Sequence, residues 1–323
     1  MKVSRLHNLD YLRGLAAFGI MAYHYILFGY GDPSTDLFIK RLGFYGVSVF
    51  YVLSGLTLFH VYRNSMQPNR EDMTDFFLKR GFRILPLLWV VTFATLLVRW
   101  SYPGEIKLLL NLTGLFGLVA PSEYIGTGVW SIGNELVFYL FFPLFMFLLR
   151  KHRGLLALVT ALLIGIYIYF AYAVLLSFGE YGTGAWHAYI NPLNQVFLFL
   201  AGFLVGAFFV SREIGNRKAL LLLASSLAAF AFYPVGGVLD LISGNTRMVF
   251  SLLCILVCIA AYKITYRLPS FMERGFGLLG EISYSLYLLH PIVWFTVEKL
   301  VREVLFAPSG GKGGAVHGAL PAA

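Results

Sequence analysis

The chain has 323 residues, of which 59% are hydrophobic and 13% are charged, and its mean hydropathy is +0.74. Soluble domains carry about 25% charged residues, so the composition excludes an ordinary soluble protein. It predicts an all-α fold, a polytopic transmembrane helical bundle in contact with membrane lipid. The net charge of +9 comes from basic residues that apolar spans separate. That distribution is typical of positively charged cytoplasmic loops, and we expect no nucleic acid as a partner.

Apolar runs of spanning length predict about nine transmembrane helices. These runs are residues 10–30, 42–62, 84–100, 130–149, 155–177, 193–210, 219–238, 247–265 and 282–306. A shorter run, 106–120, contains several polar and glycine residues, and we expect it to be a re-entrant or interfacial segment. Residues 1–306 are expected to form a single transmembrane domain, and the Gly-rich residues 307–323 a disordered tail.

The distribution of basic residues sets the orientation. Nine spans with a cytoplasmic N-terminus place 16 of the 25 basic residues on the cytoplasmic side. A full crossing of residues 106–120 would instead move the cluster at Arg150, Lys151 and Arg153 outside, against the positive-inside rule. No clear cleavage site follows the first span, so we expect it to remain as an anchor.

The first span carries two ionisable residues, Arg13 and His24. Eleven steps of about 100° return to the same helix face, so the two side chains share one face about 16 Å apart along the axis. Ionisable groups inside a span are costly and usually face the interior of a bundle, where they mark a pathway or a catalytic site.

Three later segments also carry polar groups. Arg80 and Arg83 lie three residues apart and would point the same way on a helix. Two guanidinium groups on one face suit a phosphate, although anchoring to lipid headgroups is the alternative. Glu135 follows Trp130-Ser131 near the outer end of its span. It is expected at the depth of His24, where a carboxylate would orient the imidazole; its alternative role is to pair with an arginine that holds helices together.

His290 precedes Pro291 in the last span and either lines a channel or is a buried histidine at a proline kink. Ser54-Gly55 offers small residues for close helix packing.

The two cysteines, Cys254 and Cys258, lie one turn apart in an apolar helix. They lack the further ligands that a metal site needs, and we expect no metal.

These segments together resemble the acyltransferase 3 family of integral membrane acyltransferases. The matching segments occur in the family's order: residues 9–17 with His24, residues 46–55, Arg80–Arg83, Trp130–Ser131 with Glu135, and Tyr284–Tyr287 with His290. The family usually has one more hydrophobic span after the His-Pro helix. We therefore expect either a short variant or a truncated C-terminus.

The resemblance implies O-acylation, with an acyl group, by default acetyl, moving from cytoplasmic acyl-CoA to a hydroxyl. The implied acceptor is a cell-surface or exported glycan or a lipid-linked sugar, and the implied location is the bacterial inner membrane. By the same resemblance, Arg13, Arg80 and Arg83 bind the donor phosphates. His24 acts as general base with Glu135 orienting it, or carries the acyl group transiently. The substrate channel is expected to include Asp10, Trp130, Ser131, Tyr287 and His290.

A transporter or flippase for a glycan or lipid is the alternative function, since buried ionisable residues also suit a transport path. The two arginine-containing motifs favour the acyltransferase, because a donor with a phosphate-bearing end explains them better.

Overall fold

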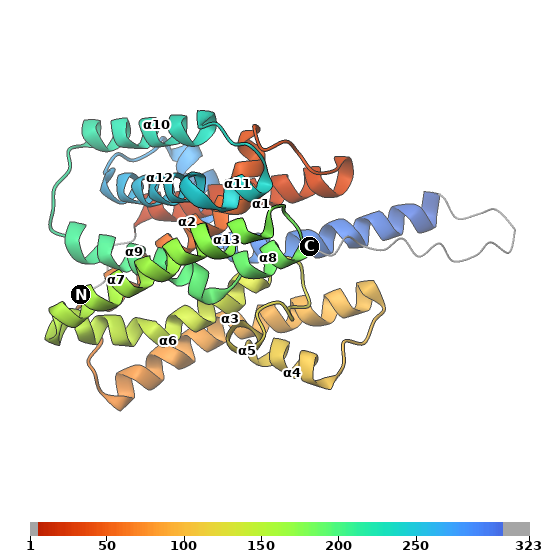
Figure 1. Cartoon of the computed structure of the whole chain (residues 1–323), viewed down its shortest axis with the longest axis horizontal. Coiled ribbons are helices and arrows are strands. Elements are labelled where there is room, and N and C mark those ends of the chain that lie inside the picture. The colour runs from red at the N-terminus through yellow and green to blue at the C-terminus, as the bar shows by residue number, and fades with distance from the viewer. Residues whose placement is uncertain (1–5, 306–323) are drawn as a thin grey trace, which may run out of the picture.

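The computed structural model describes residues 6–305, and these residues form helices without a strand (Figure 1). The predicted all-α fold is thereby confirmed, whereas the predicted tail, residues 307–323, lies outside the described residues. The long helices are α1 (His7–Tyr30), α2 (Phe38–Tyr62), α3 (Arg70–Arg99), α6 (Trp130–Lys151), α7 (Arg153–Tyr169), α9 (Pro192–Phe209), α10 (Asn216–Phe232), α12 (Gly244–Lys263) and α13 (Ser270–Leu305). The short helices are α4 (Glu105–Thr113), α5 (Phe116–Val119), α8 (Thr183–Tyr189) and α11 (Val238–Ile242). A π-helical turn (Phe170–Val174) and a 3₁₀ turn (Leu176–Phe178) extend α7.

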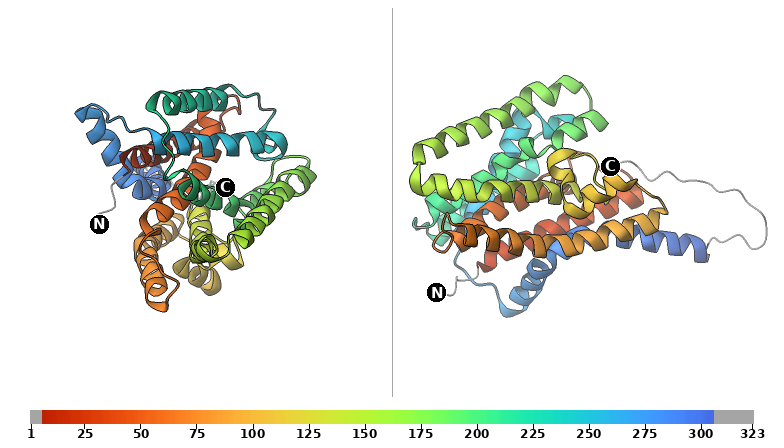
Figure 2. Two further views of the ribbon diagram at one scale, coloured as in Figure 1. Left: turned by 90° about the vertical axis from the view of Figure 1, so that its left-hand side faces the viewer. Right: turned by 90° about the horizontal axis from the view of Figure 1, so that it is seen from below.

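Within residues 6–305, eight helices are long and apolar enough to cross a membrane, one fewer than predicted. The missing one is the predicted span 219–238, which forms the 17-residue α10. The first residue of α10, Asn216, donates to Thr265 after α12 (Nδ2 to Oγ1, 2.8 Å). Near the other end of α10, the carbonyl of Phe230 accepts from Arg41 in the first turn of α2 (3.0 Å). Although short, α10 therefore runs from one end of the bundle to the other. The helices of the bundle are tilted relative to one another (Figure 2).

Helix α3 begins at Arg70, 14 residues before the predicted span. The Asn69 side chain accepts from the Asp72 amide (2.7 Å) and caps the helix, and acidic residues in the first turn favour its N-terminus. Arg80 and Arg83 therefore lie on the same helix as the span. As predicted, they point the same way, because they lie three positions apart on one continuous helix.

The segment 106–120 does not cross the bundle. It forms α4 and α5, of nine and four residues. The chain turns between them at Gly114, whose φ of 73° is one that glycine adopts without strain. Neither helix approaches the ~20 residues that a span needs, as expected for a re-entrant or interfacial segment.

Glycines allow close backbone contacts between helices. A Cβ at Gly280 of α13 would lie 2.5 Å from the Asp10 carbonyl of α1, and one at Gly14 of α1 would lie 2.6 Å from the Gly280 amide nitrogen. Gly55 of α2 likewise faces the backbone of α9, where a Cβ would overlap the Phe199 carbonyl. Close backbone approach at small residues is a common way to join helices in membranes. The predicted packing role of Gly55 is therefore confirmed.

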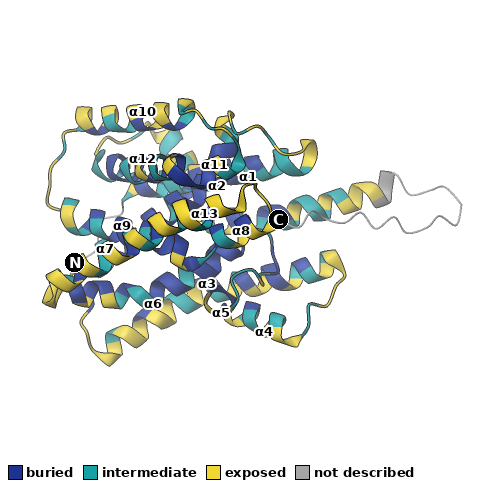
Figure 3. Cartoon of the chain, in the orientation of Figure 1, coloured by how far each residue is buried: buried dark blue, intermediate teal, exposed yellow. Residues whose placement is uncertain are grey.

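Buried residues concentrate on α2, α9, α12 and α6, whereas α3, α7 and α10 keep exposed apolar faces (Figure 3). More than half of each central span is buried, whereas the outer helices bury a smaller part of their surface. This is the distribution of a bundle whose outer surface contacts lipid.

Candidate active site

Three arginines from two helices line one cavity inside the bundle. Arg13 reaches it from α1, Arg80 and Arg83 reach it from α3, and walls from α2, α6 and α13 complete it. The atom-free space, including the part open to solvent, is about 730 Å³. We call this space the arginine cavity. The family resemblance implied Arg13, Arg80 and Arg83 as one phosphate-binding group, and the structure brings all three to the same space.

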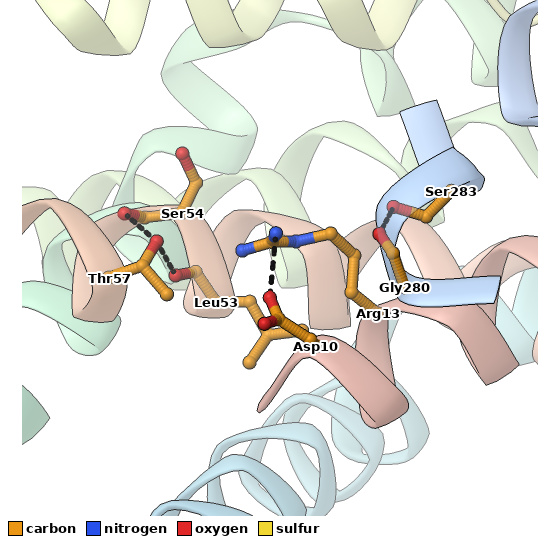
Figure 4. Close-up of polar contacts among 7 residues, drawn as sticks. All are labelled: Asp10, Arg13, Leu53, Ser54, Thr57, Gly280 and Ser283. Carbon is orange, nitrogen blue, oxygen red and sulfur yellow. Dashed lines mark hydrogen bonds and ion pairs between the residues drawn. The ribbon is translucent and has the colours of Figure 1, made fainter. Parts of the chain in front are cut away.

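The arginines have unused hydrogen-bonding capacity. Arg13 points from α1 toward Ser54 of α2, and its Nη1 lies 3.4 Å from Asp10 Oδ1 (Figure 4). The Nε of Arg80 is buried without a hydrogen-bond partner among the described residues, and the Arg80 guanidinium lies 6.0 Å from the Tyr62 ring centroid. Arg83 is exposed. A buried donor without a partner costs free energy, so this cavity is suited to an incoming acceptor such as a phosphate oxygen.

Glu135 supplies the carboxylate in the lining of the arginine cavity. Its Oε1 accepts from Ser54 Oγ (2.9 Å) and also from the Tyr139 hydroxyl. Three guanidinium groups thus face one carboxylate, and the cavity keeps a net positive charge that attracts an anion.

A second, larger cavity of about 1250 Å³ contains His24. We call it the histidine cavity. Its walls are mainly aromatic, and its charged lining residues are Asp32, Lys40 and Arg99. The aromatic members are Tyr23, Phe28, Phe44, Tyr124, Trp130, Tyr181, Trp186, Tyr189, Tyr287 and Phe295.

His24 is paired with His290 rather than with Glu135. His24 Nδ1 lies 2.9 Å from His290 Nε2, and the rings stack with centroids 5.0 Å apart. Glu135 lines the arginine cavity, whereas His24 lines the histidine cavity. The expected contact between Glu135 and His24 is therefore wrong. The reason is that α13 takes the place beside α1, while α6 presents Glu135 to α2.

The hydrogen bonds of the pair determine where its protons lie. His290 Nδ1 lies 3.1 Å from the Leu286 carbonyl, which can only accept, so Nδ1 carries the proton. In a neutral ring, His290 Nε2 is then the acceptor, and His24 Nδ1 must donate to it. His24 Nε2 is left with a free lone pair, which is what a general base requires.

The two cavities share two lining residues, Val47 of α2 and Tyr287 of α13. The Tyr287 hydroxyl lies 2.8 Å from Ser131 Oγ, on the side of the arginine cavity, and donates to the Gly128 carbonyl (3.0 Å), on the side of the histidine cavity. Gly128 has a φ of 80°, and a Cβ there would lie 3.3 Å from that hydroxyl. Tyr287 thus borders both cavities, and its hydroxyl contacts hold it in that position.

The remaining predicted channel residues are divided between these spaces. Ser131 lines the arginine cavity and Trp130 the histidine cavity, and His290 meets the histidine cavity through His24. Asp10 lies instead in a surface pocket with Glu273 and Glu281, besides its ion pair with Arg13.

Several residues of the histidine cavity were not predicted. Lys40 is 2% exposed and pairs with Asp32, and its Nζ donates to the Tyr23 hydroxyl (3.4 Å). Lys40 lies only two residues before a predicted span. This position at the membrane boundary is the sequence signal that could have identified it as a candidate. Tyr124 and Tyr181 lie in loops, and burial raises the pKa of both hydroxyls. They therefore stay protonated as neutral polar groups in the wall.

Comparison with known proteins identifies the family. The model of the acyltransferase 3 family, described as an acyltransferase domain, matches residues 6–311. No solved structure matches the chain significantly.

Curated relatives include proteins named as an O-acetyltransferase and a putative transacylase. The peptidoglycan O-acetyltransferase OatA of Listeria monocytogenes is 23% identical over 91% of this chain and 50% of its own length. The exopolysaccharide production protein ExoZ of Rhizobium meliloti is 28% identical over 80% of this chain and 78% of its own. The putative membrane-bound transacylase BcsY of Komagataeibacter xylinus is 26% identical over 89% and 72%. This chain spans half the length of the OatA relative. Because the family model covers nearly all of it, the chain belongs to the acyltransferase 3 family of membrane acyltransferases.

Proposed function

We propose that this protein transfers an acyl group, by default acetyl, from acyl-coenzyme A to a hydroxyl of a cell-surface or exported glycan. The observation that supports this most is the pair of adjoining cavities, one basic and one containing a histidine with a free lone pair. The relatives named as peptidoglycan O-acetyltransferases favour a glycan acceptor.

The arginine cavity suits the donor. Coenzyme A has a polyanionic nucleotide end, and three guanidinium groups can hold phosphates through charge-assisted hydrogen bonds. Arg13 and His24 are 11 residues apart on α1, about 16 Å along the helix axis. The pantetheine arm is long and thin and would bridge this distance, with its thioester passing Tyr287.

In the proposed reaction, His24 Nε2 takes the proton of the acceptor hydroxyl. The hydroxyl oxygen then attacks the thioester carbonyl, the carbon–sulfur bond breaks, and the proton returns from His24 to the leaving thiolate. His290 holds the His24 ring in the required tautomer by accepting from Nδ1. Direct attack is favoured over an acyl-histidine, because a single cavity holds both the base and room for the acceptor. Glu135 would not touch His24 and would instead shape the donor site beside Ser54 and Tyr139.

The charge distribution supports an orientation with the N-terminus in the cytoplasm of a bacterial inner membrane. The arginine cavity then faces the side where acyl-coenzyme A is made. The histidine cavity, whose lining includes Asp32 and Arg99 at helix ends, faces the outside.

Two measurements test the proposal. The first is mass spectrometry of surface glycans from cells with and without the protein, where a gain of one acyl unit is expected. The second is binding of labelled acetyl-coenzyme A to the full chain in lipid nanodiscs. Arg80→Ala should weaken this binding, whereas Lys79→Ala should not, because Lys79 is exposed and paired with Asp75 (2.7 Å). Unchanged glycans, or equal binding by both variants, would refute the proposed function.

A further inference from the structure

A groove on the surface of the bundle lies between α6, the first turn of α3 and the loop that joins α2 to α3. Figure 1 shows α3 beside α6, and the two helices are in contact. The atom-free space of the groove, including the part open to solvent, is about 1050 Å³. Within residues 6–305, it shares no lining residue with the arginine cavity or the histidine cavity, so it is a separate site. We call it the α6 groove.

Most of the α6 groove is apolar and open to the outside of the bundle. Leu140, Pro143, Leu144 and Phe147 are spaced i, i+3, i+4 and i+7, so they share one face of α6. Leu140 is 53% exposed, Leu144 44% and Phe147 38%, although all three lie in a candidate membrane span. Met73 of α3 lines the opposite side and is 37% exposed. These side chains therefore offer an apolar channel to the surrounding lipid.

Two basic residues, Arg150 and Lys151, close the groove at the end of α6. The Arg150 guanidinium donates to two backbone carbonyls after α2, one of them at 2.7 Å. It carries five N–H groups, so these bonds hold it in place and leave other donors for a ligand. Lys151 is exposed, and no ion pair joins it to a carboxylate among residues 6–305. The nearby Asp72 does not line the groove and accepts from the Gln67 amide (2.7 Å).

The length of the α6 groove matches one leaflet of a membrane. Leu140 and Lys151 are 11 residues apart, about 16 Å along the helix axis, and half of the hydrocarbon core is about 15 Å. The apolar part thus begins near the middle of the membrane, and the basic end lies where the headgroups begin. Arg150 and Lys151 belong to the basic cluster that indicates the cytoplasmic side, where the leaflet surface is negatively charged.

We propose that the α6 groove binds one anionic phospholipid, such as phosphatidylglycerol, from the cytoplasmic leaflet. One acyl chain lies along α6 between Leu140 and Phe147, and the phosphate pairs with Arg150 and Lys151. A zwitterionic phospholipid fits less well, because the cation in its headgroup is repelled by two basic side chains. A soluble phosphate ester also fits less well, because it leaves the apolar channel unfilled. The bound lipid joins α6 to the α2–α3 loop, where Arg150 already bonds.

Native mass spectrometry of the full chain in detergent tests the proposal, with dioleoyl phosphatidylglycerol and dioleoyl phosphatidylcholine added in equal amounts. One phosphatidylglycerol should be retained per protein, with a preference of about fivefold or more from the basic residues. Glycerol phosphate, which has no acyl chain, should bind about tenfold more weakly or less. Equal retention of the two lipids would overturn the proposal in favour of an ordinary lipid coat. Equal binding of glycerol phosphate would overturn it in favour of a site for free phosphate.

The basic end is tested by removing one charge. Lys151→Gln should weaken phosphatidylglycerol binding about fivefold, which is the usual contribution of one basic residue beside anionic lipid. Lys218→Gln is the matched control, because Lys218 is also exposed, lies in the first turn of α10 and does not line the groove. It changes the net charge by the same amount and should leave the binding unchanged. Equal losses in the two variants would overturn the proposal, since net charge rather than a defined site would then attract the lipid.

The apolar channel is tested by filling it. Leu144→Trp should weaken phosphatidylglycerol binding about tenfold, because the larger side chain takes the space of the acyl chain. Leu158→Trp is its control, since Leu158 of α7 is 65% exposed and does not line the groove. Met73→Trp repeats the test from α3, should Leu144→Trp fail to fold. Acetyl-coenzyme A binding, which depends on the arginine cavity, should be unchanged in every variant. Binding by Leu144→Trp and Met73→Trp that equals binding by Leu158→Trp would overturn the proposal.

Discussion

Replacing each histidine of the His24–His290 pair separately tests the reaction chemistry most directly. His24→Ala removes the proposed base. His290→Leu removes the acceptor for His24 Nδ1 while keeping a side chain of similar bulk, and His290→Gln keeps an acceptor at that place. His290 is 3% exposed, so both replacements remain packed against α1.

The expected effects differ in size. A general base contributes about 10²–10⁴-fold to a rate, so His24→Ala should reduce acyl transfer by that factor. A neutral hydrogen bond is worth about 0.5–1.5 kcal/mol. At about 1.4 kcal/mol per factor of ten, its loss in His290→Leu corresponds to about two- to thirteenfold. His290→Gln should lie closer to the wild type than His290→Leu.

The assay is single-turnover acetyl transfer by purified protein in nanodiscs, with donor binding measured in parallel as a control for folding. Donor affinity should stay unchanged, because neither histidine lines the arginine cavity. A His24→Ala variant that keeps a tenth or more of the rate would remove His24 as the base. A His290→Gln variant as inactive as His24→Ala would show that His290 takes part in proton transfer rather than only positioning its neighbour.

Four further outcomes are expected. Combined Arg80→Ala and Arg83→Ala should raise the donor KM tenfold or more, since a charged hydrogen bond is worth about 1.5–3 kcal/mol, and an unchanged donor KM would contradict the phosphate role. Tyr287→Phe, which removes the hydroxyl contacts to Ser131 and Gly128, should increase acetyl-coenzyme A hydrolysis without acceptor; a wild-type ratio of hydrolysis to transfer would argue against a barrier there. Gly280→Ala should destabilise the protein by about 1–3 kcal/mol through overpacking, whereas Gly277→Ala, with open space around its Cβ, should leave the thermal midpoint unchanged; equal midpoints would discount the α1–α13 contact. A cysteine at Gly182 should react with an impermeant thiol reagent from outside and one at Gly215 should not, while the buried Cys254 and Cys258 stay silent; the reverse pattern would invert the proposed orientation.

Much of the architecture can be predicted from the sequence, because the hydropathy and charge of each segment largely decide whether that segment spans the membrane. Apolar runs located the long helices, and the shorter run 106–120 was correctly predicted not to span the membrane. The shared face of Arg13 and His24 follows from helix periodicity alone. The grouping of Arg13 with Arg80 and Arg83 was implied by the family resemblance, whereas residue spacing alone predicted only that Arg80 and Arg83 point the same way.

The partner of His24 required the tertiary structure. His24 and His290 are separated by 266 positions, and hydropathy does not encode which apolar helix lies beside which in a bundle. The glycine contact between Gly14 and Gly280 draws α13 against α1 and sets their relative height, which brings His290 rather than Glu135 to the imidazole. Likewise, the pocket lined by residues of α3 and α13 exists only because these two distant helices pack together. The sequence alone therefore determined which ionisable side chains lie in membrane spans, where their burial costs free energy. The close packing of helix backbones decided which of these side chains contact one another.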